Sequence, residues 1–152
     1  MRTDWPEEHR ELYLSDPIKG HLWDSTAMGG PGLIATLLLT TIGRRSGEDR
    51  LVSLIYGEVD DGYLVVACKG GSPFHPDWYL NLEAEPEVEV QVAARRFMAR
   101  AEVLRGSWRR HCWELMVRLW PALADFQKNI QREIPVILLR PHQVLLKQGN
   151  HS

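Results

Sequence analysis

Short apolar runs separated by sharp turn signals dominate the first two thirds of the chain. Residues 33–42 are apolar and rich in β-branched side chains, and they break off at residues 43–47 before an alternating run over 51–56. This pattern predicts two strands joined by a hairpin with a basic tip. The sequence Asp60-Asp61-Gly62 then favours a tight turn into a third strand over residues 63–68.

The middle of the chain predicts a short helix followed by a second hairpin. Trp78, Leu80 and Leu82 cluster within residues 77–84, and Pro86 closes that segment, so we expect a helix there. Valines alternate with polar residues over 88–92. The pattern resumes over 97–104 after a turn near residues 94–95, which predicts two further strands.

The last third predicts one longer helix and a returning strand. Ser107 is a natural N-cap, and an apolar stripe of helical spacing follows it. The stripe consists of Trp108, Cys112, Leu115, Met116, Leu119 and Leu123. We interpret the stripe as core packing. Residues 134–139 form a final β-run that ends at Pro141.

Strands followed by helices, with one returning strand, predict an α+β fold: a mostly antiparallel barrel with flanking helices. We expect one domain over residues 1–152, with an N-terminal helix and loop (1–32), the barrel (33–141) and a polar tail (142–152). The amphipathic segment 5–14 is expected to pack as a helix. Peripheral contact with a membrane surface is the alternative, although the acidic residues of that segment disfavour it.

Composition narrows the class of protein. An apolar fraction of 44%, a charged fraction of 25% and a net charge of −2 are typical of a soluble globular domain and disfavour nucleic acid as a partner. Only two cysteines occur, without a CxxC pair, so we expect a reduced, cytoplasmic protein with no metal. No signal-peptide core and no run long enough to span a bilayer is present in the sequence.

The basic hairpin tip is the clearest candidate for chemistry. Its two glycines free the backbone to approach a ligand, and Arg44, Arg45 and Arg50 offer bidentate donors to phosphate oxygens. A solvated hairpin tip with ordinary surface arginines is the alternative. A second cation flanked by glycines, Lys69, follows the third strand and would complete a clamp on a polyanion if it is more than a plain loop residue.

The predicted short helix adds an aromatic and amide group. Trp78, Tyr79 and Asn81 could pack a planar ring and hydrogen-bond its edges, although a tryptophan in a short helix is more often part of the core. No catalytic triad or pair of acids stands out, because Cys68 lacks a nearby histidine and His75 has no evident partner. A cofactor-dependent redox enzyme needs no such group, since the cofactor carries the electrons.

Three motifs carry a resemblance to a known family: residues 36–47, residues 68–71 and residues 75–82. Residues 20–24 and 133–136 extend it over nearly the whole chain. Together they resemble the deazaflavin-dependent nitroreductase and quinone reductase family of actinobacteria. The resemblance implies a split β-barrel related to the FMN-binding, pyridoxamine-phosphate-oxidase-like proteins, with coenzyme F(420) as cofactor. It also implies hydride transfer to a quinone, a nitroaromatic or an activated alkene.

The resemblance assigns roles to individual residues. The phosphate and tail of the cofactor map onto Arg44, Arg45, Ser46, Arg50 and Lys69, and the deazaflavin pocket onto Trp78, Tyr79 and Asn81. The candidate cofactor-binding set further includes Ala67, Cys68 and Gly70. The substrate pocket maps onto Trp120, Leu123 and Phe126, where the family carries a tyrosine-rich run, so an apolar acceptor is expected.

The catalytic group stays open, with Cys68 and Tyr79 as weak candidates. Two alternatives stay open as well: a reductase that uses FMN on the same fold, and a non-catalytic deazaflavin-binding protein. The expected partner is a small hydrophobic acceptor, and the chain is expected to be a monomer or a homodimer.

Overall fold

The computed structural model describes residues 14–15, 21–24, 33–68 and 73–145. The strands are β1 (Leu22–Asp24), β2 (Leu33–Ile42), β3 (Asp49–Ile55), β4 (Gly57–Val59), β5 (Gly62–Val66), β6 (Glu87–Val92), β7 (Arg95–Val103) and β8 (Val136–Val144). The helices are α3 (Asp77–Ala84), α4 (Gly106–Leu119) and α5 (Ala122–Lys128). None of the helices in these ranges is long and apolar enough to cross a membrane.

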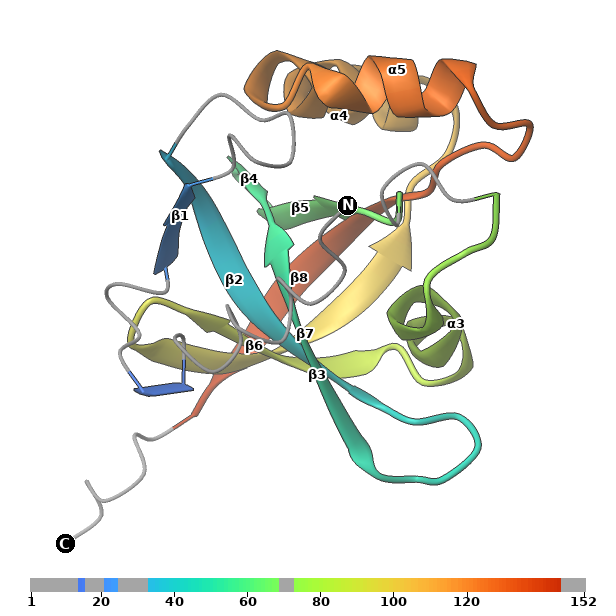
Figure 1. Ribbon diagram of the computed structural model, residues 1–152. Coiled ribbons are helices and arrows are strands. Elements are labelled where there is room, and N and C mark those ends of the chain that lie inside the picture. Colours follow the sequence, from blue (N-terminus) through green and yellow to red (C-terminus); the bar gives the residue numbers. More distant parts are fainter. Residues whose placement is uncertain (1–13, 16–20, 25–32, 69–72, 146–152) are drawn as a thin grey trace, which may run out of the picture.

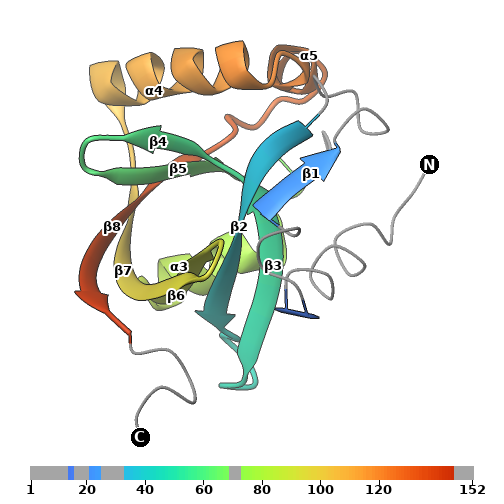
Figure 2. The ribbon, with the colours of Figure 1, turned by 90° about the vertical axis from the view of Figure 1, so that its left-hand side faces the viewer.

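The described strands form one strongly curled antiparallel sheet (Figures 1 and 2). Its order is β1-β2-β6-β7-β8-β5-β4, and β3 pairs with β2 beside this path. Helices α4 and α5 cover one side of the curled sheet, and α3 lies near the β2–β3 hairpin. The predicted α+β split barrel is confirmed.

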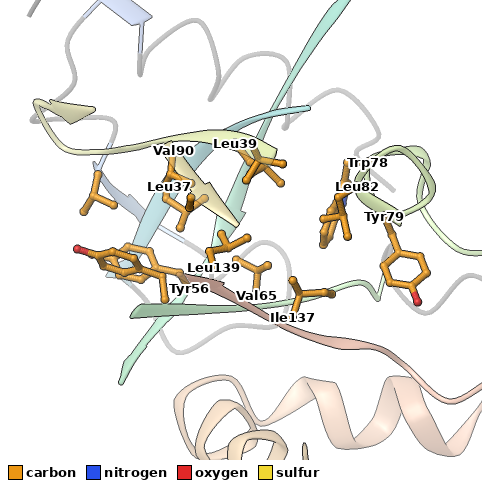
Figure 3. Packing of buried hydrophobic residues seen from close by; sticks show 14 of the residues in the cluster. Leu37, Leu39, Tyr56, Val65, Trp78, Tyr79, Leu82, Val90, Ile137 and Leu139 are labelled. Atoms are coloured by element: carbon orange, nitrogen blue, oxygen red, sulfur yellow. The ribbon is translucent and has the colours of Figure 1, made fainter. Parts of the chain in front are cut away.

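β5 and the first four residues of β8 are buried on both faces. Side chains of a strand alternate between its two faces, so each strand feeds two cores. Val65 of β5 and Ile137 of β8 enter an inner cluster within the curled sheet (Figure 3). Val66 and Leu138 enter an outer cluster beneath α4 and α5. This explains why these strands appear in the sequence as continuous apolar runs.

The structure corrects two predicted strand boundaries. The Asp60-Asp61 turn joins β5 to a separate short strand, β4, which the sequence pattern did not reveal. β8 also continues past Pro141 to Val144, instead of ending at Pro141. The proline is tolerated because β5 pairs with β8 only as far as Leu139, and the register of β7 against β8 shifts beside it.

The predicted cap and stripe of the long helix also differ from the structure. α4 begins at Gly106, and its N-cap is Arg105 without a side-chain hydrogen bond, so the prediction of Ser107 as N-cap is wrong. The stripe is divided between two helices because Trp120 ends α4 ahead of Pro121.

Burial tests the interpretation of the stripe as core packing. Cys112, Met116 and Leu123 are buried in the outer cluster, which confirms core packing for these members. Trp108 instead is 38% exposed and lies against the Arg140 guanidinium. The predicted N-terminal helix over 5–14 lies outside the described residues except for Leu14.

Gly62 is required where the β4–β5 turn enters the central strand. Its φ is +148°, and a Cβ there would overlap the backbone carbonyl of Leu139 and lie 3.0 Å from Pro141 Cδ. We expect Gly62→Ala to lower the free energy of unfolding by about 3 kcal/mol, measured by chemical denaturation. Gly47→Ala is the control, because Gly47 also has a positive φ (+76°) but a Cβ there would meet no other atom. For this control the free energy of unfolding should fall by only about 1 kcal/mol. Equal losses would contradict the backbone overlap.

Candidate functional site

The β2–β3 hairpin displays its arginines around a cavity. The Gly43 amide donates to Glu48 O at 2.7 Å, and the Gly47 amide donates to Gly43 O at 2.8 Å, which closes the tip. A Cβ at Gly43 would lie 2.8 Å from Ser46 Oγ, so the tight tip favours glycine. The cavity has a volume of about 450 Å³. It is lined by Gly43, Arg44, Arg45, Ser46, Arg50, Leu51, Val52, Asp77, Trp78 and Asn81.

The charge of this lining is positive, because three arginines face a single aspartate. Within the described ranges, no hydrogen bond or ion pair engages the Arg45 guanidinium. The Arg50 side chain is 58% exposed, and its polar contacts with described side chains are long, at 3.4 Å to Ser46 Oγ and 3.8 Å to Glu48 Oε1. Two of the three guanidiniums are therefore available to an anion.

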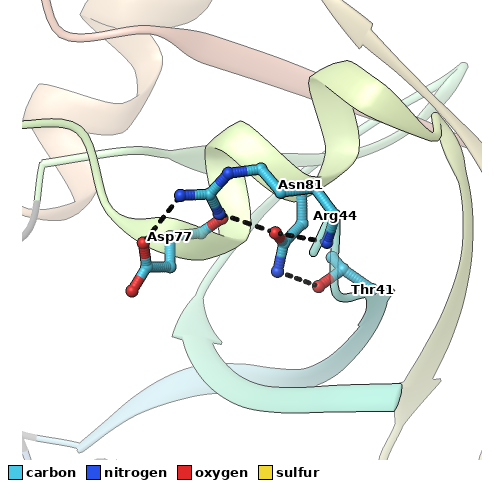
Figure 4. Close-up of polar contacts among 4 residues, drawn as sticks. All are labelled: Thr41, Arg44, Asp77 and Asn81. Atoms are coloured by element: carbon cyan, nitrogen blue, oxygen red, sulfur yellow. Dashed lines mark hydrogen bonds and ion pairs between the residues drawn. The ribbon is translucent and has the colours of Figure 1, made fainter. Parts of the chain in front are cut away.

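Arg44 has a different role, because it joins the hairpin to α3 (Figure 4). Its Nη1 donates to Asn81 Oδ1 at 2.8 Å, its backbone amide donates to the same oxygen at 3.2 Å, and its Nη2 lies 3.3 Å from Asp77 Oδ1. Asn81 Nδ2 donates in turn to Thr41 Oγ1 at 3.2 Å. The Asn81 amide, predicted to bind the cofactor, thus fastens α3 to the hairpin.

Trp78 and Tyr79 occupy different positions on α3. Trp78 lines the cavity while 92% of it is buried in the inner cluster. Tyr79 does not line the cavity, and its hydroxyl donates to Glu83 Oε2 at 2.9 Å. Burial, with help from Glu83, raises the pKa of Tyr79 to about 12. A phenol that holds its proton this tightly is a poor proton donor near neutral pH.

A second cavity, of about 570 Å³, lies beside the β6–β7 turn, but its arginine and histidine side chains already have partners. Arg96 Nη2 lies 2.6 Å from Glu89 Oε2, and His142 Nε2 lies 2.7 Å from Glu87 Oε1. Arg95 donates to the Tyr63 hydroxyl at 2.6 Å. The hairpin cavity is therefore the stronger anion site.

Sequence reasoning missed a cluster around Arg132, in the connection between α5 and β8. Arg132 Nη1 donates to Ala67 O at 3.0 Å, and Nη2 donates to Cys68 O at 3.2 Å. Nη1 also lies 3.2 Å from His75 Nδ1, and the His75 ring packs on Tyr79 with centroids 4.7 Å apart. His75 therefore has partners, contrary to the sequence-based expectation. No local pattern could have revealed contacts across 57 residues or more.

Ala67 and Cys68 are described but do not line the hairpin cavity. Lys69 and Gly70 lie outside the described residues. Ala67 belongs to the inner cluster and Cys68 to the outer one. Because Tyr79 also belongs to the inner cluster, the two weak catalytic candidates, Cys68 and Tyr79, lie in different cores.

The predicted substrate residues lie together in the outer cluster, with the Trp120 and Phe126 rings edge to face at 5.8 Å. The outer cluster lies on the α4–α5 side of the molecule, at the opposite end from the hairpin tip (Figures 1 and 2). Leu123 is fully buried in it. The Trp120 indole N–H is buried and finds no hydrogen-bond partner among the described residues.

Comparison with known proteins decides the family. A sequence model of the F(420)H(2)-dependent quinone reductases matches residues 24–141. The chain belongs to the F(420)H(2)-dependent quinone reductase family. It is therefore an oxidoreductase, and its cofactor is coenzyme F(420), as expected from the sequence.

Individual relatives agree with this assignment. An F(420)H(2)-dependent quinone reductase of Mycobacterium tuberculosis (strain H37Rv) is 36% identical over 117 residues, which cover 72% of this chain and 75% of the relative. A solved F(420)-H(2) dependent reductase is 40% identical, with a TM-score of 0.65 over 69% of this chain and 93% of that chain. A structure described as a domain-swapped dimer is 36% identical, with a TM-score of 0.68 over 90% and 98% of the two chains.

More distant structures confirm the fold alone. A putative pyridoxamine 5′-phosphate oxidase from Listeria innocua is 14% identical, with a TM-score of 0.54 over 72% of this chain and 86% of that chain. At this identity the likeness shows that the quinone reductase shares the split barrel, and nothing about its ligands.

The link between Arg44 and Asn81 can be tested on stability. Asn81→Ala leaves the Arg44 amide and the Thr41 hydroxyl without this partner in a buried place, so the free energy of unfolding should fall by about 2–3 kcal/mol in urea denaturation. Thr41→Val is the matched control, because it removes only the bond to Asn81 Nδ2, and it should cost about 1 kcal/mol. A loss for Asn81→Ala no larger than for Thr41→Val would contradict the link.

Proposed function

We propose that this enzyme reduces quinones with a hydride from reduced coenzyme F(420), and that the hairpin cavity holds the phosphate of the cofactor. The Arg45 guanidinium, which has no hydrogen bond or ion pair to any described residue, lies in a cavity of net positive charge and carries the proposal. Arg50 is the second proposed phosphate ligand, and the Ser46 hydroxyl is within reach of Arg50 to share the anion. Arg44 would contribute through its charge and by holding the hairpin in place.

The residues present fit a phosphorylated, ring-bearing cofactor. The cavity places guanidiniums and the indole of Trp78 around one space, so an anion and a flat apolar group can bind side by side. Cofactor contacts by Ala67, Cys68, Lys69, Gly70, Tyr79 and Asn81 remain predictions from the resemblance. Reduced coenzyme F(420) supplies the hydride, and the protein supplies orientation and exclusion of water.

We place the acceptor at Trp120 and Phe126, beneath α4 and α5. A buried indole N–H without a partner costs free energy, and a quinone carbonyl would satisfy it. The surrounding cluster is apolar, which suits a quinone ring. The hairpin tip and this cluster lie at opposite ends of the molecule. Hydride transfer needs contact between the deazaflavin ring and the acceptor, so in this proposal the ring extends from the hairpin cavity, past Trp78, toward the cluster.

The finer assignments also belong to this proposal. Nitroaromatics and activated alkenes are secondary acceptors in it, since the 120–126 segment offers no phenol to bind a nitro group. The relative described as a domain-swapped dimer supports a homodimer over a monomer. A cytoplasmic location and contact with a membrane surface stay predictions.

Cofactor titration tests the anion site. Arg45→Gln and Arg50→Gln should each weaken binding of coenzyme F(420) about tenfold, because a charge-assisted contact contributes about 1.5–3 kcal/mol. Quenching of tryptophan fluorescence gives the Kd. Arg118→Gln, on the exposed face of α4, is the control and should leave the Kd unchanged. FMN is titrated in parallel, and tighter binding of FMN by the native chain would favour the FMN alternative.

Turnover tests the acceptor site. Trp120→Phe keeps the aromatic packing but removes the unsatisfied N–H, so thermal stability should hold while the KM for a quinone rises several-fold. Trp113→Phe, in the same cluster but against Arg109, is the matched control with unchanged KM. Oxidation of reduced cofactor is followed with quinones, nitroaromatics and enones. If none of these acceptors is reduced, the non-catalytic alternative gains.

A further inference from the structure

Arg132 contacts both sides of the segment that follows β5. Its guanidinium donates to the carbonyls of Ala67 and Cys68, which directly precede residues 69–72. The same guanidinium lies against His75 Nδ1, which directly precedes Pro76, the N-cap of α3. One side chain therefore fixes the position at which the chain leaves the sheet and the position at which it enters the helix of the hairpin cavity.

We propose that Arg132 is a positioning residue, which holds the strand end at residues 67–68 and the His75 entry to α3 in the arrangement that coenzyme F(420) binds. This inference rests on the proposed function. Trp78 and Asn81 follow His75 on α3 and line the hairpin cavity, so these residues depend on this contact. Arg132 itself is not proposed to touch the reacting atoms.

Geometry explains why an arginine stands here. Three acceptors from two segments surround it, and a planar guanidinium presents several donors in fixed directions, which a lysine ammonium cannot match. The side chain is partly buried, and the Ala67 and Cys68 residues that carry two of the acceptors are buried. Removal of the guanidinium would take one hydrogen bond away from each of those carbonyls, which is costly.

The contact with Arg132 also determines the protonation state and the tautomer of His75. An arginine can only donate, so Nδ1 must accept, which leaves a neutral ring with its proton on Nε2. Burial, followed by the Arg132 charge, lowers the pKa of His75, against a weaker opposite effect of Glu83. Tyr79, which packs on the ring, stays protonated. The neutral ring preserves the contact with Arg132 at neutral pH.

Arg109 provides a matched control. Its Nη2 donates to Ile134 O at 2.5 Å, and its Nη1 lies 3.5 Å from Glu133 Oε2, so it also ties a helix to the connection that precedes β8. Its side chain is 15% exposed, and its contacts with described residues do not include residues 67–68 or His75. Arg109→Met therefore removes a similar contact without touching either side of the segment.

The experiment compares Arg132→Met, Arg132→Lys and Arg109→Met. For Arg132→Met we expect a Kd for coenzyme F(420) about tenfold higher, faster tryptic cleavage after Lys69 and a higher His75 pKa by NMR titration. Arg132→Lys should lie between this variant and the native protein, and it keeps the test valid if Arg132→Met fails to fold. Arg109→Met should lower the melting temperature without changing the three readouts.

Two results would overturn the inference. One is an unchanged His75 pKa and cleavage rate in both Arg132 variants, and the other is an equal rise in Kd for Arg109→Met. If the native chain binds no coenzyme F(420), the proposed function fails, and the cleavage rate and His75 titration still decide whether Arg132 holds the two segments.

Discussion

Burial of β5 and of the first half of β8 on both faces is the constraint on which the structure depends. In β8, Val136, Ile137, Leu138 and Leu139 are all completely buried, and alternate residues enter the inner and outer clusters. Each such side chain contributes about 1.5–3 kcal/mol by leaving water. The strands can be covered on both sides only if the sheet curls around one core and carries helices over the other. The barrel and its α4–α5 cover follow from this requirement.

The same constraint determines where polar chemistry can be placed. The buried strand faces offer no room for charged groups, so the charged and amide groups gather where strands end: at the β2–β3 tip and beyond β5. Arginines near these ends have two kinds of role. Arg44 and Arg132 are bound to protein acceptors and hold segments together. Arg45 and Arg50 extend from the tip with weak protein contacts or none among the described residues, as a ligand-binding group requires.

Local patterns in the sequence predicted the fold well. The bounds of β2 and α3 follow from periodicity and turn residues, because these signals depend on near neighbours in the chain. Two predictions were wrong because the outcome depends on tertiary context. Ser107 is a plausible N-cap, but α4 begins before it, at Gly106. Pro141 is a plausible strand end, but β5 pairs with β8 only as far as Leu139, so the proline costs no hydrogen bond to that strand. The sequence also predicted that Arg44, Arg45 and Arg50 gather at one hairpin, and they do line one cavity, while their role in binding stays a prediction. The division of labour among them was not predicted, because it depends on Asn81, which is 37 residues from Arg44.

The contacts of Asn81 hold the two parts of the proposed cofactor site, the β2–β3 hairpin and α3, together. A hairpin tip with three arginines repels itself, and exposed tips are held only weakly by their own backbone hydrogen bonds. Asn81 accepts two hydrogen bonds from Arg44, and Asp77 faces the same guanidinium, so α3 fixes the Arg44 side chain. The positive charges of Arg45 and Arg50 remain available in the cavity. α3 is in turn held at its entry by His75 and Arg132. The proposed anion site is therefore organised without a ligand, and little of the binding free energy would have to be spent on ordering it.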